Sequence, residues 1–290
     1  MITRNTLLAW AAMGLVLMGG VMPAAYDSAT QPLNVKEKLV DVEGCRLYFT
    51  WIPGNDTIVL LEAGGGMDST VWKQIAATVA RKTGATVLSY DRAGFGQSDL
   101  PDSPCRMDVE TRWLHTGLER LGLDKNLVLV GHSYGGWMIR LFASMYPEQV
   151  RGMVFVDPFS VELVDLLGVD YLDNHPMAGK LPFDTSHPEK LNKFQKAAVR
   201  MVGDGLGPKV KLMRKAVLPK GIPIRLITSR QRFMPQMNEQ EAWWKAHQQI
   251  AAGNPDIVLV EATKSGHMVP ITEPDLIIDQ IAEVIQESKR

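Results

Sequence analysis

Cysteine is scarce in this chain, whose 290 residues include only two, Cys45 and Cys105. They can form a disulfide only if the fold brings their Cα atoms within about 6 Å of each other, so two free thiols remain the alternative. Neither cysteine has the spacing to histidine that a zinc site needs. We therefore predict no metal site.

No charge of either sign dominates the sequence, because 31 basic residues stand against 32 acidic ones and no basic stripe is present. A nucleic-acid-binding surface is therefore not expected. Internal repeats and low-complexity segments are also missing. With 46% hydrophobic residues the chain can build a core, and its length suits one large α/β domain with an elaboration, or two small domains.

Near the start of the chain, residues 7–25 carry no charge and follow Arg4. A membrane-spanning helix needs about 20 apolar residues, whereas the apolar part of a signal peptide needs about 7–15. We predict that residues 1–26 are a cleaved signal peptide or an uncleaved membrane anchor. Either one implies an exported or membrane-anchored protein on the periplasmic or extracytoplasmic side, and an uncleaved anchor would associate with the membrane through residues 7–25.

From residue 35 onwards, short apolar segments alternate with helical patterns. The predicted strands are residues 39–42, 46–51, 57–61, 86–90, 127–130, 153–156, 224–228 and 257–260. The predicted helices are residues 70–81, 109–121, 137–146, 239–252 and 274–286. Several strands are almost wholly apolar, which is typical of a parallel sheet covered on both faces, while Glu43-Gly44 indicates a hairpin between the first two. We expect an α/β fold with a doubly wound, mostly parallel eight-stranded sheet.

The stretch between residues 156 and 224 is longer than one crossover helix requires. It contains several prolines among helix-compatible segments, residues 161–167 and 188–202. A structureless loop of this length is uncommon in a compact domain. We therefore predict a core of residues 35–158 and 220–290, with residues 159–219 inserted as a helical cap.

A strand-to-helix turn carries the strongest chemical signal, Gly131-His132-Ser133-Tyr134-Gly135. This is a G-x-S-x-G motif between a buried strand and a helix, the context in which it forms a nucleophile elbow. Glycines allow the strand and the helix to approach closely, so that the serine hydroxyl protrudes. We predict Ser133 as a catalytic nucleophile.

Three more segments make the chain resemble the α/β-hydrolase superfamily, in its serine-nucleophile branch. Residues 89–99 read SYDRAGFGQSD, similar to the D-x-x-G-x-G-x-S segment after that fold's fourth strand. Residues 146–152 read YPEQVRG, similar to the link into its sixth strand, and Gly266-His267 follows the last predicted strand. The resemblance covers most of residues 39–286 and implies a capped hydrolase fold. Within it, Asp91 and Arg92 are expected to tie the loop after the fourth strand to the elbow.

A serine hydroxyl needs a base within hydrogen-bond reach. The resemblance places this base at His267, while His132 fills the variable elbow position and is expected to point away. We expect His115 and His247 to be structural or solvated, and His175 and His187 to lie in the cap.

The carboxylate that orients the base is less obvious from the sequence. The superfamily usually supplies it after the seventh strand, but residues 228–235 contain no acid. Asp157, at the end of the sixth predicted strand, matches an alternative location in several branches of the fold, and we assign it. An ordinary Asp-Pro turn remains the alternative reading, and Glu239 and Glu241 are weaker candidates.

Two backbone N–H groups are expected to form an oxyanion hole. One belongs to Tyr134, and the other to the glycine-rich loop after the third predicted strand. The superfamily commonly has His-Gly there, and aligning that pair on Ala63-Gly64 makes Gly65 the candidate, with Gly66 as the alternative.

Together these residues predict a serine hydrolase that cleaves an ester or related acyl bond of a small molecule, without a cofactor. The same residues also suit a carbon–carbon bond hydrolase or a peptidase. A non-catalytic ligand-binding relative, or a membrane-anchored interaction protein, stays open as a different class.

Overall fold

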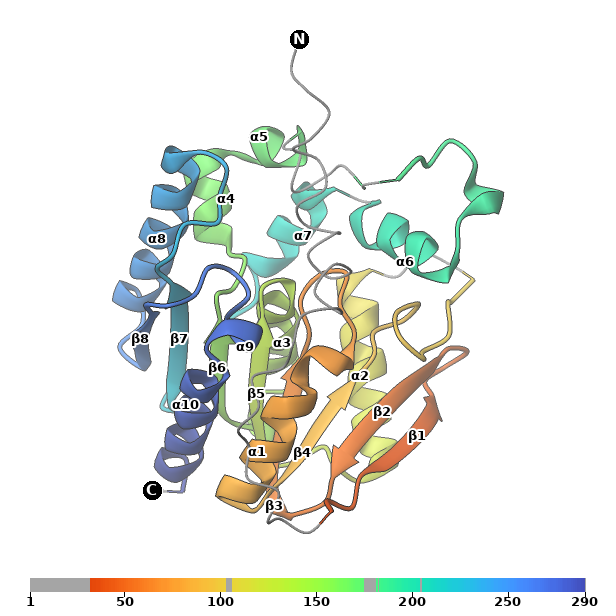
Figure 1. Cartoon of the computed structure of the whole chain (residues 1–290), viewed down its shortest axis with the longest axis vertical. Helices are drawn as coiled ribbons and strands as arrows, with labels where there is room; N and C mark the ends of the chain where they lie inside the picture. Colours follow the sequence, from red (N-terminus) through yellow and green to blue (C-terminus); the bar gives the residue numbers. More distant parts are fainter. Residues whose placement is uncertain (1–31, 103–105, 175–180, 182, 204, 290) are drawn as a thin grey trace.

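The computed structural model describes residues 32–102, 106–174, 181, 183–203 and 205–289. Its centre is an eight-stranded sheet in the order β1-β2-β4-β3-β5-β6-β7-β8 (Figure 1). The strands are β1 Lys36–Asp41, β2 Arg46–Ile52, β3 Asn55–Glu62, β4 Ala85–Tyr90, β5 Leu127–His132, β6 Val150–Val156, β7 Ile224–Ser229 and β8 Ile257–Ala262. Strand β2 pairs antiparallel with β1 and β4, and all other pairs are parallel. The predicted doubly wound, mostly parallel sheet is confirmed.

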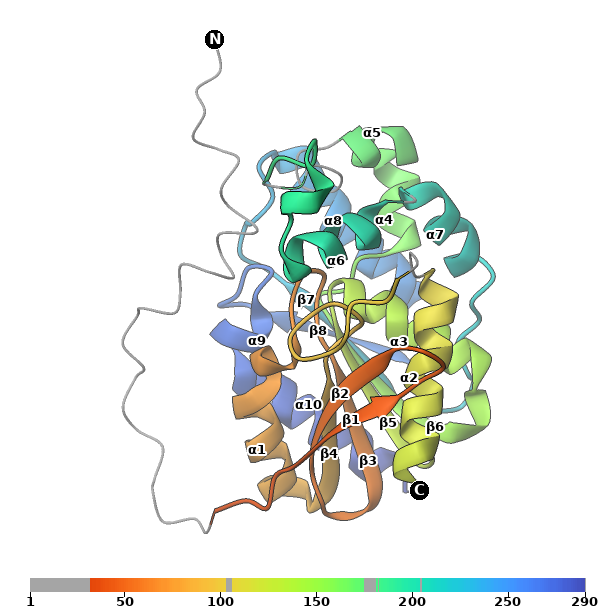
Figure 2. The same cartoon turned by 90° about the vertical axis from the view of Figure 1, so that its right-hand side faces the viewer.

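Helices cover both faces of this sheet, which explains the apolar strands. Figure 2 shows α1 (Lys73–Thr83) and α10 (Pro274–Glu287) on one side, with α2 (Met107–Leu121) and α3 (Tyr134–Met145) on the other. The helix α8 (Met237–Ala252) packs on the same face as α2 and α3. Every residue of β4, β5 and β7 is buried as a result. Each large aliphatic side chain buried in this way contributes about 1.5–3 kcal/mol.

The chain between β6 and β7 forms a group of helices, which lies above the sheet in Figure 1. Its elements are α4 (Val161–Leu167), α5 (Val169–Asn174), the 3₁₀ helix η4 (Pro188–Lys190), α6 (Lys193–Val202) and α7 (Leu206–Met213). Helix α3 joins this group to the sheet, because Ile139 and Phe142 pack on the strands while Trp137 and Leu141 pack against α4 and α7. The predicted helical insertion is therefore present.

Two of the predicted helices are each divided into two elements in the structure. The single helix expected over residues 188–202 is divided into η4 and α6, because the Asn192 side chain accepts from the Gln195 N–H and forms a capping box. The helix expected over residues 70–81 starts as a 3₁₀ turn, η2 (Ser69–Trp72), and continues as α1.

Some predictions fall outside the described residues, namely the leader, residues 1–26 with its uncharged stretch 7–25, and Cys105. Among the residues that are described, no helix has both the length and the apolar character to cross a membrane. Cys45 is buried in the turn of the β1–β2 hairpin, and burial raises the pKa of its thiol to about 11.

Candidate active site

Three strand ends at the carboxyl edge of the sheet bring the predicted side chains together. Ser133 follows β5, Asp157 follows β6, and His267 lies in the loop after β8. The Ser133 Oγ is 2.8 Å from His267 Nε2, and His267 Nδ1 is 2.7 Å from the Asp157 Oδ2. Since an ionised carboxylate only accepts, Nδ1 carries the imidazole proton and Nε2 presents a lone pair to the serine hydroxyl.

The backbone at Ser133 is held in a strained conformation, with φ 53° and ψ −118°. The residues two positions to either side must be glycines, since an added Cβ at Gly135 would lie 2.6 Å from the Glu62 carbonyl oxygen and one at Gly131 2.5 Å from the Gly135 carbonyl oxygen. The Ser133 N–H donates to Val156 O at 3.0 Å, which fastens the elbow to the end of β6. Strain of this kind persists only where the surroundings enforce it.

Asp157 is fully buried and accepts four hydrogen bonds. The Ser229 N–H and the Trp243 indole donate to Oδ1 at 2.8 and 3.0 Å, and the Ser229 hydroxyl and His267 donate to Oδ2 at 3.0 and 2.7 Å. Burial alone would raise the pKa of this carboxyl, but the bonds from His267 and from the Ser229 N–H hold it below its usual value. Asp157 is therefore an ionised carboxylate facing the imidazole.

Sequence reasoning missed Ser229 and Trp243 as partners of the carboxylate. Ser229 is the last residue of β7, next to the loop in which the resemblance places the acid and in which no acid was found. The lack of an acid in that loop was a usable signal. It indicated that the carboxylate comes from β6, and the neighbouring end of β7 is then the place to look for its hydrogen-bond donors. Trp243 reaches Asp157 from α8 and carried no comparable signal.

His247 supports the turn that follows β6. Its Nε2 donates to Pro158 O at 2.9 Å, so its Nδ1 accepts from the Thr228 hydroxyl at 2.8 Å. Burial lowers the pKa of this imidazole, which keeps it neutral. Of the two expected roles for His247, structural or solvated, the structure shows the structural one.

The expectation that His132 points away is wrong, because its ring lies against His267. Its Nε2 donates to the main-chain oxygen of His267 at 2.8 Å, and the centroids of the two rings are 4.8 Å apart. The ring is turned this way because the space beside it is left open by Gly64, where a Cβ would lie 2.8 Å from Nδ1. Burial lowers the pKa of His132 to about 3, with the neighbouring His267 as a further cause. It is a neutral ring that holds the main chain of His267.

The glycine-rich loop after β3 places Gly65 next to the elbow. A Cβ at Gly65 would lie 3.4 Å from the Cβ of Tyr134 and 3.6 Å from the Met201 methyl of α6, whereas one at Gly66 would meet nothing within 4 Å. This proximity favours Gly65 over Gly66 as the partner of Tyr134 in the oxyanion hole, which remains a prediction.

The remaining candidates have other surroundings. Glu239 is buried and accepts from the Gln236 N–H and the Tyr171 hydroxyl at the start of α8. Glu241 is exposed. His115 stacks on Tyr146 at 3.7 Å, His187 is exposed beside Glu189, and His175 lies outside the described residues.

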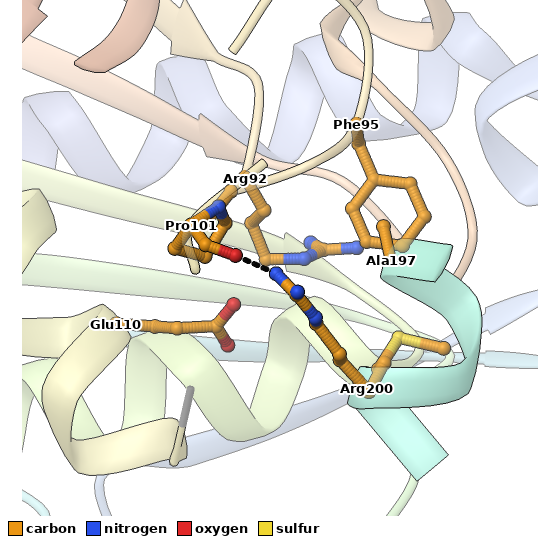
Figure 3. Close-up of a pocket in the computed structure, with 8 residues that line it drawn as sticks. Arg92, Phe95, Pro101, Glu110, Ala197 and Arg200 are labelled. Atoms are coloured by element: carbon orange, nitrogen blue, oxygen red, sulfur yellow. Dashed lines mark hydrogen bonds between the residues drawn. The ribbon is translucent and has the colours of Figure 1, made fainter. Parts of the chain in front are cut away.

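A small cavity lies between the segment after β4, α2 and the cap helix α6. Figure 3 shows two guanidinium groups, of Arg92 and Arg200, and the Glu110 carboxyl around it. Arg200 donates to Pro101 O. Burial raises the pKa of Glu110 to about 7, although the charge of Arg92 opposes this rise. Within the described part of the chain, no cluster of His, Cys, Asp and Glu side chains has the arrangement to bind a metal ion.

Comparison with known proteins gives a family match and several relatives. The family model for the alpha/beta hydrolase fold matches residues 56–186. The uncharacterized protein YqjL of Bacillus subtilis is 24% identical over 242 residues, which is 83% of this chain and 88% of that protein. The 1-acylglycerol-3-phosphate O-acyltransferase of Arabidopsis thaliana is 30% identical over 107 residues, covering 36% of this chain but only 25% of that enzyme.

Solved structures with the same architecture share little sequence. The haloalkane dehalogenase DatA of Agrobacterium tumefaciens C58 superposes with a TM-score of 0.63 at 19% identity, covering 88% of this chain and 97% of that one. An alpha/beta hydrolase fold protein from Burkholderia ambifaria gives a TM-score of 0.61 at 18% identity, covering 86% and 100%. At this level of identity, the likeness concerns the fold.

Proposed function

This chain has the α/β-hydrolase fold, and from that premise we propose that it is a serine hydrolase acting on an ester or related acyl bond of a small molecule. One observation carries the proposal. Ser133, His267 and Asp157 form a continuous hydrogen-bonded chain, with contacts of 2.8 and 2.7 Å, from a strained strand-to-helix turn to a buried carboxylate.

The chemistry follows from this order of groups. His267 Nε2 takes the hydroxyl proton as Ser133 Oγ attacks the carbonyl carbon, and Asp157 stabilises the imidazolium that results. The N–H groups of Tyr134 and Gly65 stabilise the negative oxygen of the tetrahedral intermediate. His267 then gives its proton to the leaving group, and a water molecule releases the acyl group from Ser133 by the same route.

Serine at the elbow also separates this proposal from the reactions named for some structural neighbours. In similar folds, dehalogenases and epoxide hydrolases use an aspartate as the nucleophile, whereas here Ser133 stands in the strained position. An oxygen nucleophile activated by a neutral imidazole suits attack on a carbonyl carbon. We therefore place the acyl-transfer proposal ahead of these two reactions.

The experiment is labelling with a fluorophosphonate probe, combined with p-nitrophenyl esters of graded chain length. Wild-type protein is expected to be labelled and to hydrolyse at least one ester, and Ser133→Ala is expected to lose both properties. Ser288→Ala, at the end of α10, serves as the matched control and keeps them. Labelling that persists in Ser133→Ala refutes the nucleophile. A wild-type protein that is neither labelled nor active favours a ligand-binding role.

We also propose that residues 1–26 direct the protein out of the cytoplasm. Fractionation of expressing cells and an intact mass of the recovered protein test this proposal. Soluble protein in the cytoplasmic fraction with the full mass contradicts it, and a shortened mass in the periplasm identifies a cleaved signal.

A further inference from the structure

Arg92, two residues after β4, is buried, with 3% of its surface exposed, and donates hydrogen bonds to three acceptors. Its guanidinium donates to the Glu62 carboxylate at the end of β3, to Ala63 O at 2.6 Å and to Gly64 O at 2.5 Å. The three acceptors belong to consecutive residues, namely the last residue of β3 and the first two residues of the loop that carries the predicted oxyanion donor. Arg92 and Asp91 are expected to tie the loop after β4 to the elbow. The hydrogen bonds of Arg92 go instead to the main chain of the loop after β3, and its guanidinium lies 5.5 Å from the ring centroid of Tyr134 in the elbow.

The bond from Arg92 to Gly64 O, which also accepts from the Met67 N–H at 3.3 Å, fixes the orientation of the next N–H group. In a planar trans peptide the C=O and the following N–H point in opposite directions, and no described peptide bond is cis. With Gly64 O turned towards Arg92, the Gly65 N–H must point to the other side of the loop. Among the described residues this N–H donates to no protein acceptor, which leaves it available to a ligand.

The other side of the loop is also held in place. Gly64 lies against the His132 ring, and Gly65 lies beside the Tyr134 Cβ, next to the nucleophile. The loop is therefore clamped between a guanidinium and the elbow. A lysine ammonium could not reproduce this clamp, because the planar fork of arginine presents several donors in a fixed arrangement.

We propose that Arg92 is the residue that positions the oxyanion hole, by binding the Ala63 and Gly64 carbonyls and so directing the Gly65 N–H at the developing oxyanion. This inference rests on the proposed acyl-transfer function. Arg92 acts through the loop and does not touch the substrate, so it is a positioning residue. Glu62 balances its charge in the core.

The test uses the full chain and a charge-balanced variant, Glu62→Gln/Arg92→Met, because Arg92→Met alone would leave a buried carboxylate unpaired. Arg225→Met is the matched control. Arg225 is also a buried arginine, 5% exposed and paired with Glu287, but it lies at the amino end of β7, away from the site. Active sites are first titrated with the fluorophosphonate, so that every rate refers to correctly folded protein.

Two readouts separate positioning from a structural role. We expect kcat per titrated site to fall about 10²–10³-fold in the double variant with KM nearly unchanged, as when one oxyanion donor is lost. The affinity for a trifluoromethyl ketone, which forms a charged tetrahedral adduct on Ser133, should fall by the same factor. The kcat of Arg92→Lys should lie between those of the wild type and the double variant. If the double variant does not fold, the same two readouts are measured on Arg92→Lys. Arg225→Met should lower only the melting temperature.

Unchanged kcat and unchanged ketone affinity per titrated site, in the double variant or in Arg92→Lys, overturn the positioning role while the serine hydrolase proposal stands. A wild-type protein that is neither labelled nor active overturns the proposed function, and this inference with it.

Discussion

Replacing Asp157 by asparagine tests the carboxylate at the end of β6 almost without changing its volume. The Oδ1 position receives two N–H donors, from Ser229 at 2.8 Å and from Trp243 at 3.0 Å. Neither group can accept a hydrogen bond, so the oxygen of the new amide must occupy this position. The amide NH₂ then faces the Ser229 hydroxyl, which can rotate to accept, and His267 Nδ1.

This orientation reverses the imidazole. Because the amide donates to Nδ1, the proton of the neutral ring moves to Nε2, which faces the Ser133 hydroxyl. A protonated Nε2 cannot accept the serine proton, so the base is lost although every side chain stays in place. The wrong tautomer lowers kcat about 10⁴-fold in the well-studied serine proteases, which corresponds to about 5.5 kcal/mol of activation free energy. We expect a loss of this size here.

The assay is the steady-state hydrolysis of the best p-nitrophenyl ester, together with the rate of fluorophosphonate labelling. Glu239→Gln is the control, because Glu239 is a buried acid that caps α8, and its kcat should stay close to wild type. If Asp157→Asn keeps kcat within tenfold of wild type, Asp157 is not the carboxylate that orients His267. A fall in the kcat of Glu239→Gln would then assign that role to Glu239.

Two further predictions concern groups next to the site. The pKa of Glu110 is raised from 4.5 to about 7, so the protonated carboxyl favours the folded state. This contribution to the free energy of unfolding, up to about 3 kcal/mol, is complete below pH 4.5 and is lost as the pH rises through 7. Glu110→Gln should therefore unfold at a higher urea concentration than wild type at pH 8 but not at pH 4.5, and an equal shift at both pH values would contradict the assignment. His132→Phe keeps a ring in the same space but removes the bond to His267 O, so kcat should fall up to about tenfold. Since His132 is already neutral above a pKa of about 3, the pH profile between 5 and 8 should keep its shape, and a displaced profile would show that His132 titrates during turnover.

Sequence reasoning reached the sheet because apolar strands and helical periodicity are local signals. Ser133 and His267 were also accessible, since each stands in a short motif at a strand end. The partners of the carboxylate were not, because Ser229 and Trp243 meet Asp157 through tertiary packing across 72 and 86 residues of chain. Arg92 belonged to a recognised segment, but its effect depends on which carbonyls it binds, and side-chain identity does not specify this.

The position of the acid follows from the geometry of two neighbouring strands. Strands β6 and β7 are parallel, with Val156 opposite Ile227, and the Asp157 N–H donates to Ile227 O at 2.7 Å. Their carboxyl ends are therefore level, and a side chain from either end can reach the same imidazole. A buried carboxylate on β6 then needs donors to remain ionised, and Ser229 on β7 supplies two of them from the strand end next to which the acid is usually found. Ser229→Ala removes the hydroxyl donor to Asp157 Oδ2 and keeps the N–H donor to Oδ1. It should therefore weaken catalysis by raising the pKa of Asp157, and the dependence of kcat on pH checks this.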